Sequence, residues 1–261
     1  MLFRSVTNSG GEIVVLTSGG YGPATISQPV IITATGVDAS ISVTSLDGTG
    51  LTINTPGNVT ITGLSLHGQA TGAFGIDVQQ IGFLRLYNVL IENFKSFGVD
   101  FQSQPVETMG TLAIDGSPIN DNGLFPPYPG FPGAGLVVQP RGNGGSVYIS
   151  NTSFDNNNIG VSVSGLPVTV VDSSAENNGT GFRAQSGGSL VLSNVRAVSN
   201  GIGLSALADG SLYFANCLIA NNTTAYSSDS STTMAGSNPG TSLIGTGQTV
   251  SGTLSTAVVL Q

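Results

Sequence analysis

Several residue types are nearly absent from this sequence, and each absence excludes a class of protein. The 261 residues include no tryptophan, one cysteine and one histidine, and only 8% of them are charged. The single cysteine, Cys217, excludes a disulfide framework within the chain, and its apolar surroundings predict a buried thiol that packs as a small apolar group. No apolar run approaches the ~20 residues that a membrane-spanning helix needs.

Positive charge is also scarce. Six Lys and Arg residues stand against fourteen Asp and Glu residues, which gives a formal net charge of −8. Clustered cations are what bind nucleic acids and anionic membrane surfaces, so this balance argues against both as partners. Neutral glycans and cationic ligands remain open.

The sequence is rich in glycine, with 38 residues, and it contains a repeat between Ser146 and Tyr226. A repeat of 21 or 22 residues cannot bury its apolar side alone, so it predicts a solenoid of stacked units. The four copies read VYISNTSFDNNNIGVSV from Val147, VTVVDSSAENNGTGFRA from Val168, LVLSNVRAVSNGIGLSA from Leu190 and LYFANCLIANNTTAYSS from Leu212.

Each copy predicts three short strands. Apolar residues alternate at its start, as in Val147/Ile149, which is the period of a strand with one buried face. A second strand leads to an asparagine at a fixed offset, and a glycine three residues later opens a third strand. We expect the asparagines to hydrogen-bond between coils and to supply the left-handed backbone of the turn. These asparagines are Asn122, Asn157, Asn178, Asn200 and Asn222. Three strands in about 22 residues predict an all-β, single-domain right-handed parallel β-helix.

Ser146 to Tyr226, together with GGEIVVLTSGGYGPATISQPVII near the start, resembles the pectin-lyase-like right-handed parallel β-helix superfamily, and within it secreted bacterial repeat proteins of unknown activity. The resemblance covers most of residues 11–228 and implies an extracellular or cell-surface location. Residues 1–10 are interpreted as a truncated or non-native remnant, and we expect an export signal to be missing from this fragment. Residues 229–261 are expected to hold a last rung and a Ser/Thr/Gly-rich tail.

Insertions in three early coils predict where a site lies. They fall at 102–110 and 123–134, and the turn 139–145, which carries Arg141, is also enlarged. All three border one edge of the third-strand stack, and solenoids accept such insertions at functional faces. Outward positions on successive third strands are predicted to be Asp77, Asp100, Val137, Ser162, Arg183, Ser205 and Ser227.

Asp77 and Asp100 are predicted to stand on neighbouring strands ~4.8 Å apart, where two carboxylates repel unless a cation, a proton or a partner intervenes. The family resemblance implies one use for such a pair, because lyases of this fold hold Ca²⁺ against a uronic acid. Asp77 and Asp100 are therefore candidate calcium and ligand-binding residues. The alternative is a pair of solvated carboxylates on a wet face.

The insertion GLFPPYPGFPGA carries Phe125, Tyr128 and Phe131 at three-residue spacing, between prolines that stiffen the backbone. Exposed rings of this kind stack on sugar faces or on a protein partner, so these residues are candidates for ligand binding. A lid that only covers the coil is the alternative. On the second strand, His67 and Glu92 are expected on adjacent coils, as an acid-base pair or as a plain surface pair.

No convincing catalytic set emerges. Polygalacturonases of this fold carry an Asp-Asp pair and a Gly-His-Gly element, whereas this chain has no Asp-Asp and reads Leu66-His67-Gly68. The Trp/His/Arg-rich motifs of pectate lyases have no counterpart, although Arg141 or Arg183 can serve in principle as a base. We therefore expect an exported bacterial protein that binds extracellular polysaccharide or a cell-surface partner on its lateral face. The alternatives are a polysaccharide lyase or related enzyme at the same face, and a structural stalk or adhesin module.

Overall fold

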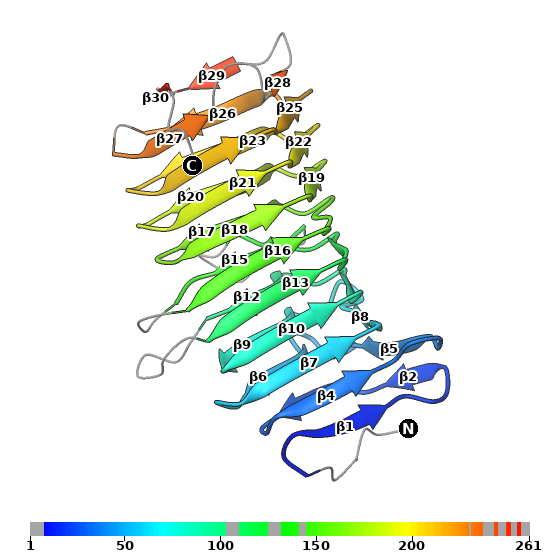
Figure 1. Cartoon of the computed structure of the whole chain (residues 1–261). Helices are drawn as coiled ribbons and strands as arrows, with labels where there is room; N and C mark the ends of the chain where they lie inside the picture. The colour runs from blue at the N-terminus through cyan, green and yellow to red at the C-terminus, as the bar shows by residue number, and fades with distance from the viewer. Residues whose placement is uncertain are drawn as a thin grey trace.

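The computed structural model describes residues 8–102, 110–124, 132–140, 145–229, 231–236, 243–244, 249–251 and 255–256. Within these residues the regular secondary structure is entirely β, and the strands wind into a parallel solenoid of about 9 turns. Successive turns add strands to three stacks that run along the molecule (Figure 1). The predicted parallel β-helix is confirmed.

The first stack is a parallel sheet that lies in front in Figure 1. Its register advances one coil at a time, so that Val147 pairs with Val168 and Leu190 pairs with Leu212, as the repeat predicts. Its strands are β1 (Gly11–Val14), β4 (Val30–Thr33), β7 (Asn58–Thr62), β10 (Phe83–Tyr87), β13 (Thr111–Asp115), β16 (Ser146–Ser150), β18 (Pro167–Val171), β21 (Ser189–Ser193), β24 (Ser211–Ala215), β27 (Thr233–Gly236) and β30 (Ser255–Thr256).

The second stack consists of two shorter sheets, and Ser153 lies between them: its carbonyl accepts the N–H of Ile119 from the first sheet, and an isolated bridge pairs it with Ser174 of the second. One sheet contains β2 (Gly19–Tyr21), β5 (Ala39–Ser42), β8 (Leu64–His67), β11 (Leu90–Glu92) and β14 (Ile119–Asn120). The other contains β19 (Ser174–Glu176), β22 (Arg196–Val198), β25 (Leu218–Ala220) and β28 (Leu243–Ile244).

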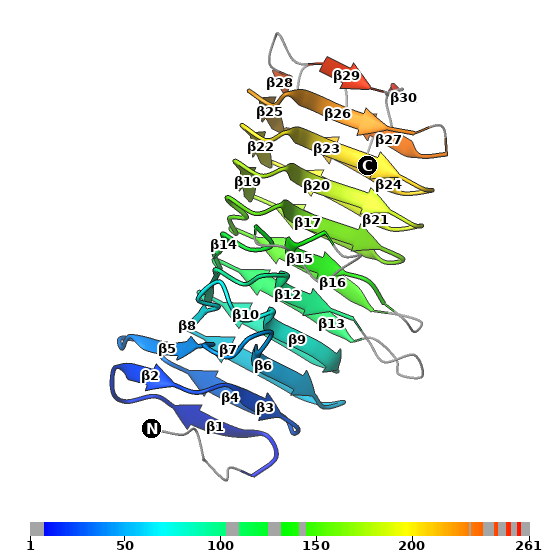
Figure 2. The ribbon, with the colours of Figure 1, turned by 180° about the vertical axis from the view of Figure 1, so that it is seen from behind.

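The third stack is a parallel sheet that comes into view from behind (Figure 2). It runs from Ala24 to Ser251, and its early strands connect to the insertions. Its strands are β3 (Ala24–Ile26), β6 (Thr49–Asn54), β9 (Phe74–Gln80), β12 (Phe97–Phe101), β15 (Ala134–Val138), β17 (Ile159–Ser164), β20 (Thr180–Gln185), β23 (Ile202–Leu207), β26 (Thr224–Ser228) and β29 (Thr249–Ser251).

The core is one continuous apolar cluster that extends along the axis from Val15 to Met234. Alternate residues of every stack point into it, for example Val59, Leu84 and Leu112 on successive first strands, which are completely buried. Each coil has two open apolar sides and buries them only against the coils before and after it. The inner stripes of aliphatic residues are therefore what holds the solenoid together.

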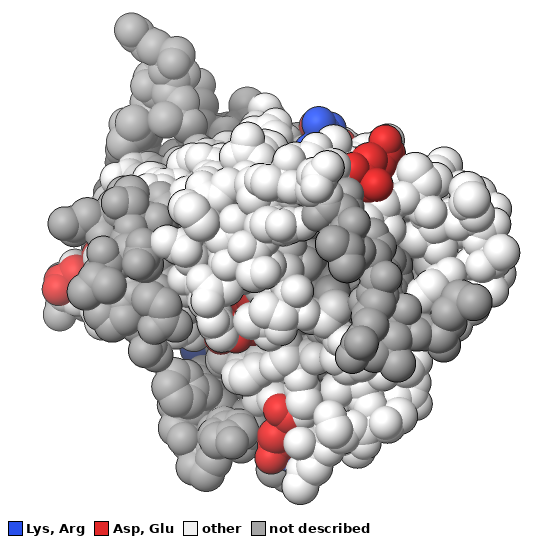
Figure 3. Space-filling model, turned by 90° about the horizontal axis from the view of Figure 1, so that it is seen from below, with Lys and Arg blue, Asp and Glu red and all other residues white. Residues whose placement is uncertain are grey.

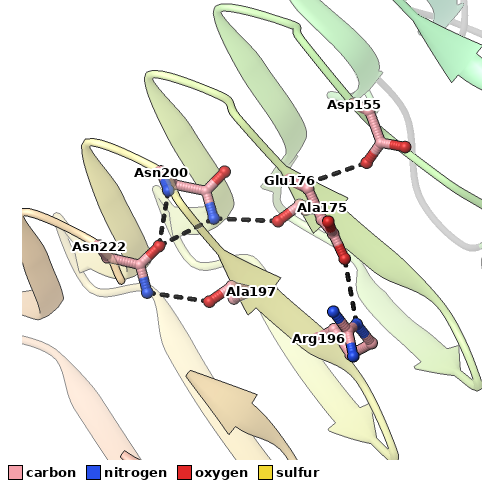
Figure 4. Close-up of polar contacts among 7 residues, drawn as sticks. All are labelled: Asp155, Ala175, Glu176, Arg196, Ala197, Asn200 and Asn222. Carbon is pink, nitrogen blue, oxygen red and sulfur yellow. Dashed lines mark hydrogen bonds and ion pairs between the residues drawn. The ribbon is translucent and has the colours of Figure 1, made fainter. Parts of the chain in front are cut away.

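Buried asparagines connect the coils at the turn between the second and third strands. The backbone N–H and the side-chain amide of Asn200 both donate to Oδ1 of Asn222, at 2.8 and 3.0 Å (Figure 4). The same amide also donates to the carbonyl of Ala175, at 2.9 Å. Equivalent bonds join Asn122 to Asn157, Asn157 to Asn178 and Asn178 to Asn200.

The left-handed residue of this turn is not the one that the repeat suggested. Positive φ angles occur one position earlier, at Asn156 (55°), Asn177 (57°) and Asn221 (56°). The buried asparagine must place its side chain inside the turn to bond three backbone or side-chain groups, whereas its predecessor faces outward. The predecessor therefore adopts the strained conformation that asparagine tolerates, and the prediction that the buried asparagines supply the left-handed backbone was wrong.

Hydroxyl groups join the coils at the opposite corner, between the first and second strands. The N–H of Ser117 donates to Oγ1 of Thr152 at 3.4 Å, and the N–H of Thr152 donates to Oγ of Ser173 at 3.2 Å. Cys217 continues this row with a buried thiol whose Sγ lies 3.2 Å from the carbonyl oxygen of Ala215. Burial raises the pKa of the Cys217 thiol, so the thiol stays protonated and acts as a packing group.

The glycine near the start of third strands such as β17 and β20 is required by close approach of the backbone. A Cβ atom added to Gly181 would lie 2.7 Å from the carbonyl oxygen of Gly203, and one added to Gly160 would lie 2.6 Å from that of Gly181. A side chain at these positions would force neighbouring coils apart. The glycine spacing of the sequence is therefore a consequence of coil stacking.

The surface of the solenoid carries few charges. Viewed along the axis from the N-terminal end, Lys, Arg, Asp and Glu side chains are scattered over a mainly uncharged surface (Figure 3). Among the residues that the structure describes, no helix has the length and apolar character that crossing a membrane requires.

Candidate functional site

Two adjacent coils repeat the sequence Phe-Gly-x-Asp on the third-strand sheet. Phe74 and Asp77 belong to β9, Phe97 and Asp100 belong to β12, and the register pairs Phe74 with Phe97 and Asp77 with Asp100. The residue before each aspartate, Ile76 or Val99, is completely buried in the core, so the aspartates point to the outer face. The phenylalanine rings are 5.8 Å apart between centroids. The predicted proximity of Asp77 and Asp100 is confirmed.

Asp77 is half-buried and is held by Gln79, whose Nε2 donates to Oδ2 of Asp77 at 2.8 Å. Burial raises the pKa of Asp77 because it removes water from the carboxylate, and the hydrogen bond from Gln79 offsets part of this effect. A half-buried carboxyl of this kind keeps its proton to a higher pH than an exposed aspartate does.

Asp100 is buried, with 6% of its surface exposed, so the alternative of two solvated carboxylates is wrong for this residue. A second apolar cluster surrounds this part of the outer face. It contains Phe97, Ala134, Val137 and Ile159, with Phe74 packed against it. At these coils the third-strand sheet therefore has apolar groups on both faces. A sheet with one solvent-exposed face has them on the core side only.

The outward row continues in the predicted order through Val137, Ser162, Arg183, Ser205 and Ser227. Arg183 lies three strands beyond Asp100, which is roughly 14 Å at the usual strand spacing. Its Nη2 donates to Oγ1 of Thr180 at 3.1 Å, and burial lowers its pKa. The structure therefore does not bring Arg183 to the aspartate pair as a base. Arg141, Phe125, Tyr128 and Phe131 lie outside the described residues.

The calcium ion predicted at Asp77 and Asp100 needs more ligands than these side chains supply. Calcium takes about six to eight oxygen ligands. In the described part of the chain, no three His, Cys, Asp or Glu side chains come close enough to hold a metal ion together. One of the two carboxylates is also buried. The described side chains therefore do not fit a calcium ion that the protein alone would hold.

His67 and Glu92 also meet as predicted, but on a different sheet. They end β8 and β11, and His67 Nδ1 lies 2.9 Å from Glu92 Oε1. Farther along this row, Oδ1 of Asp155 accepts the N–H of Glu176 at 3.0 Å, and Glu176 forms an ion pair with Arg196 (Figure 4). The two predicted pairs, His67–Glu92 and Asp77–Asp100, therefore lie on separate faces and cannot share one substrate atom.

Carboxylates outnumber cations along this second-strand face. Burial raises the pKa of Asp121, and the charge of Glu92 raises it further. Burial also raises the pKa of Asp155, and the negative charges of Glu176 and Asp121 raise it further. Like charges on successive coils disfavour ionisation of their neighbours.

A polar hollow at the corner between the first and second strands was not predicted from the sequence. It has a volume of about 510 Å³. Its lining residues are Asn151, Thr152, Ser153, Asp172, Ser173, Ser174, Asn194 and Arg196. Two coils contribute three consecutive polar residues each, and the third contributes Asn194 and Arg196; that recurrence of polar residues was the available signal.

The fold and its faces define a right-handed parallel β-helix, and the solved structures that the chain resembles share this architecture. One is the A-module of the mannuronan C-5 epimerase AlgE4 of Azotobacter vinelandii, with a TM-score of 0.57 and 16% identity over 95% of this chain and 89% of that one. The AlgE6 A-module of the same organism gives 0.53 and 17%, over 95% and 91% of the two chains. Pectate lyase Pel9A gives 0.53 and 15%, over 97% of this chain and 70% of that one.

At these identities the similarity establishes the fold alone. No protein-family model matches the sequence, and no curated protein matches it.

Proposed function

We propose that this chain is an exported protein that binds extracellular polysaccharide on the outer face of its third-strand sheet, around Asp77 and Asp100. The observation that carries the proposal is the duplicated Phe-Gly-x-Asp motif, whose rings and carboxylates pair in register. The solenoid itself does not need acidic residues here, because other coils have Thr52, Ser162 or Ser205 in the same row. Two carboxylates on adjacent strands repel unless a proton, a cation or a partner intervenes, and a bound ligand is one such partner.

The accessible part of this face suits a carbohydrate. Thr52, Phe74, Asp77 and Gln79 are partly exposed, whereas Asp100, beside Asp77 on the next strand, is buried. Carboxylate and amide groups bond sugar hydroxyls, and a partly exposed ring packs on the apolar face of a sugar. The ligand class is supported by the names of the similar structures, since mannuronan and pectate are both polysaccharides. An extracellular polysaccharide requires an exported protein.

A glycan array with the whole chain, screened with and without calcium, tests the proposal. A hit is then titrated by calorimetry against Asp77→Asn, Asp100→Asn and the matched control Asp209→Asn, which makes the same change at an exposed turn. Loss of one hydrogen bond from a charged group is worth about 1.5–3 kcal/mol, so Asp77→Asn should weaken binding about tenfold or more. Asp209→Asn should bind like the parent. Full affinity in both site variants would place the ligand elsewhere.

A related enzyme, such as a polysaccharide lyase, is the second candidate function, and the raised pKa of Asp77 favours it. A carboxyl that keeps its proton to a higher pH can act as a general acid. Each polysaccharide that binds is incubated with the parent and with Asp77→Asn, and new unsaturated or reducing ends are measured. Product from the parent but not from the variant would support catalysis. Binding without product in either would leave a binding protein.

A further inference from the structure

We propose that the hollow at the corner between the first and second strands binds a neutral saccharide of one or two rings. This site is separate from the third-strand face and does not depend on the function proposed above. The hollow spans the coils that begin with β16, β18 and β21, and every residue that lines it is polar. Its volume of about 510 Å³ lies within the usual range for small-ligand sites, roughly 300–1,000 Å³.

The hollow lies where two consecutive small side chains stand between larger ones in one row. Along this row, Leu90 lies opposite Pro118, Ser153 opposite Ser174, and Arg196 opposite Leu218. Pro118 and Arg196 flank this pair in the adjacent coils, and the smaller Ser153 and Ser174 leave the corner open between them. Residues of three coils therefore line the hollow, and Arg196 of the third coil lies at one end.

The floor and one wall of the hollow are held in place by hydrogen bonds. Thr152 and Ser173 donate inward to the carbonyls of Ser150 and Val171, at 2.8 and 2.7 Å, and so form a fixed floor. Asn151, Asp172 and Asn194 form the wall and have φ angles of 48°, 49° and 56°. Nδ2 of Asn194 donates to Oδ1 of Asp172. A prearranged polar wall loses little conformational entropy when a ligand binds.

The groups around the hollow determine the class of ligand. The Arg196 guanidinium, the asparagine amides and the serine hydroxyls can donate, while Asp172 and the amide oxygens accept. Nε of Arg196 is bonded to Glu176 at 3.0 Å, which fixes the guanidinium at the end of the hollow. A ligand must therefore offer many donors and acceptors, as a sugar does. Asp172 and Glu176 outweigh the one cation, so a neutral sugar is favoured over an acidic one.

Nuclear magnetic resonance of the whole chain tests this proposal with cellobiose and maltose as probes and digalacturonate as the acidic comparator. The reporters are the side-chain NH₂ signals of Asn151 and Asn194 and the Nε–H of Arg196. We expect saturable shifts with at least one neutral disaccharide at millimolar concentrations, as for an open polar site. No shift with either sugar, or stronger binding of digalacturonate, would overturn the proposal.

Filling the hollow provides the decisive variant. Ser153→Leu/Ser174→Leu introduces the side chain that the same row already carries at positions 90 and 218, and it should weaken binding at least tenfold. Ser65→Leu is the matched control, because Ser65 pairs with Leu90 in this row but does not line the hollow. It should leave the affinity unchanged.

Arg196→Ala is a second variant in case the double replacement disturbs folding, since the Arg196 side chain is 55% exposed. It should weaken binding several-fold. Asp77→Asn should not alter these signals, which separates this site from the third-strand face. Equal affinity in the filled variant and the parent would refute the site.

Discussion

The regular coils between Ser146 and Ser228 and the earlier coils between Asn58 and Val138 share one backbone plan but use polar side chains differently. In the regular coils the third-strand outer row carries Ser162, Ser205 and Ser227, interrupted by Arg183. In the earlier coils the same row carries Asp77 and Asp100 beside an apolar outer cluster. The repeat thus encodes the stacking of the coils, and departures from the repeat mark the surface that we propose binds a ligand.

Buried asparagines join neighbouring coils in the regular region. Replacing one of them, Asn178→Leu, is expected to cause the largest loss of stability. Asn178 accepts the N–H of Asn157 and donates to Phe154 O and Asn200 Oδ1, at 2.7, 2.8 and 2.9 Å. Leucine removes these bonds and leaves buried backbone groups unsatisfied, so we expect a loss of about 1–3 kcal/mol. Chemical denaturation measures it. Asn158→Leu, one residue outside the buried row, should cost much less, and equal losses would argue against the special role of the row.

The sequence predicts the neighbours along each row well, because they follow from the repeat. His67 beside Glu92 and Asp77 beside Asp100 needed only an alignment of coils with a constant register. The burial of Asp100 could not be predicted in this way, since it depends on what packs on the outer face. A period of two identifies which residues point outward, but it does not reveal whether the outer face is wet.

Two other features depend on packing between coils rather than on one segment of sequence. In the Asn156-Asn157 doublet either residue suits a left-handed turn, and only the packed coil shows that Asn157 is the buried one. The hollow depends on side-chain volumes in coils that are about 20 residues apart, and Ser153 pairs with Ser174 in an isolated bridge outside the regular strands. Such a cavity is a property of the stack, so no single repeat reveals it.

Asp77→Asn tests the earlier coils. It is expected to change the free energy of unfolding less than Asn178→Leu does, and to raise it rather than lower it. The pKa of Asp77 is raised in the folded protein, so folding is opposed by ionisation of this group above that pKa. Its contribution to stability therefore improves as the pH falls from neutral through the raised pKa towards the ordinary value of 3.8.

Asparagine removes the charge and keeps an acceptor for Gln79. At pH 7 the variant should be more stable than the parent by no more than about 1 kcal/mol, because the carboxyl is still partly exposed to solvent. Denaturation at about pH 7 and about pH 4 measures this, and the gain should disappear at the lower pH. A variant less stable than the parent at pH 7 would mean that the Asp77 charge is compensated within the fold.

The smallest effect is expected from Glu92→Gln on the second-strand face, which belongs to the same early coils but has a partly exposed hydrogen-bonded pair, His67 and Glu92. His67 and Glu92 are both partly exposed, so losing their 2.9 Å contact should change the free energy of unfolding by less than about 0.5 kcal/mol. The titration of Asp121 should still respond, because the Glu92 charge helps to raise its pKa. Carbon-detected titration of the Asp121 carboxyl should show its midpoint falling in the variant. An unchanged midpoint would mean that burial alone raises the pKa of Asp121, and a large loss of stability would give the His67–Glu92 pair a structural importance that its exposure does not suggest.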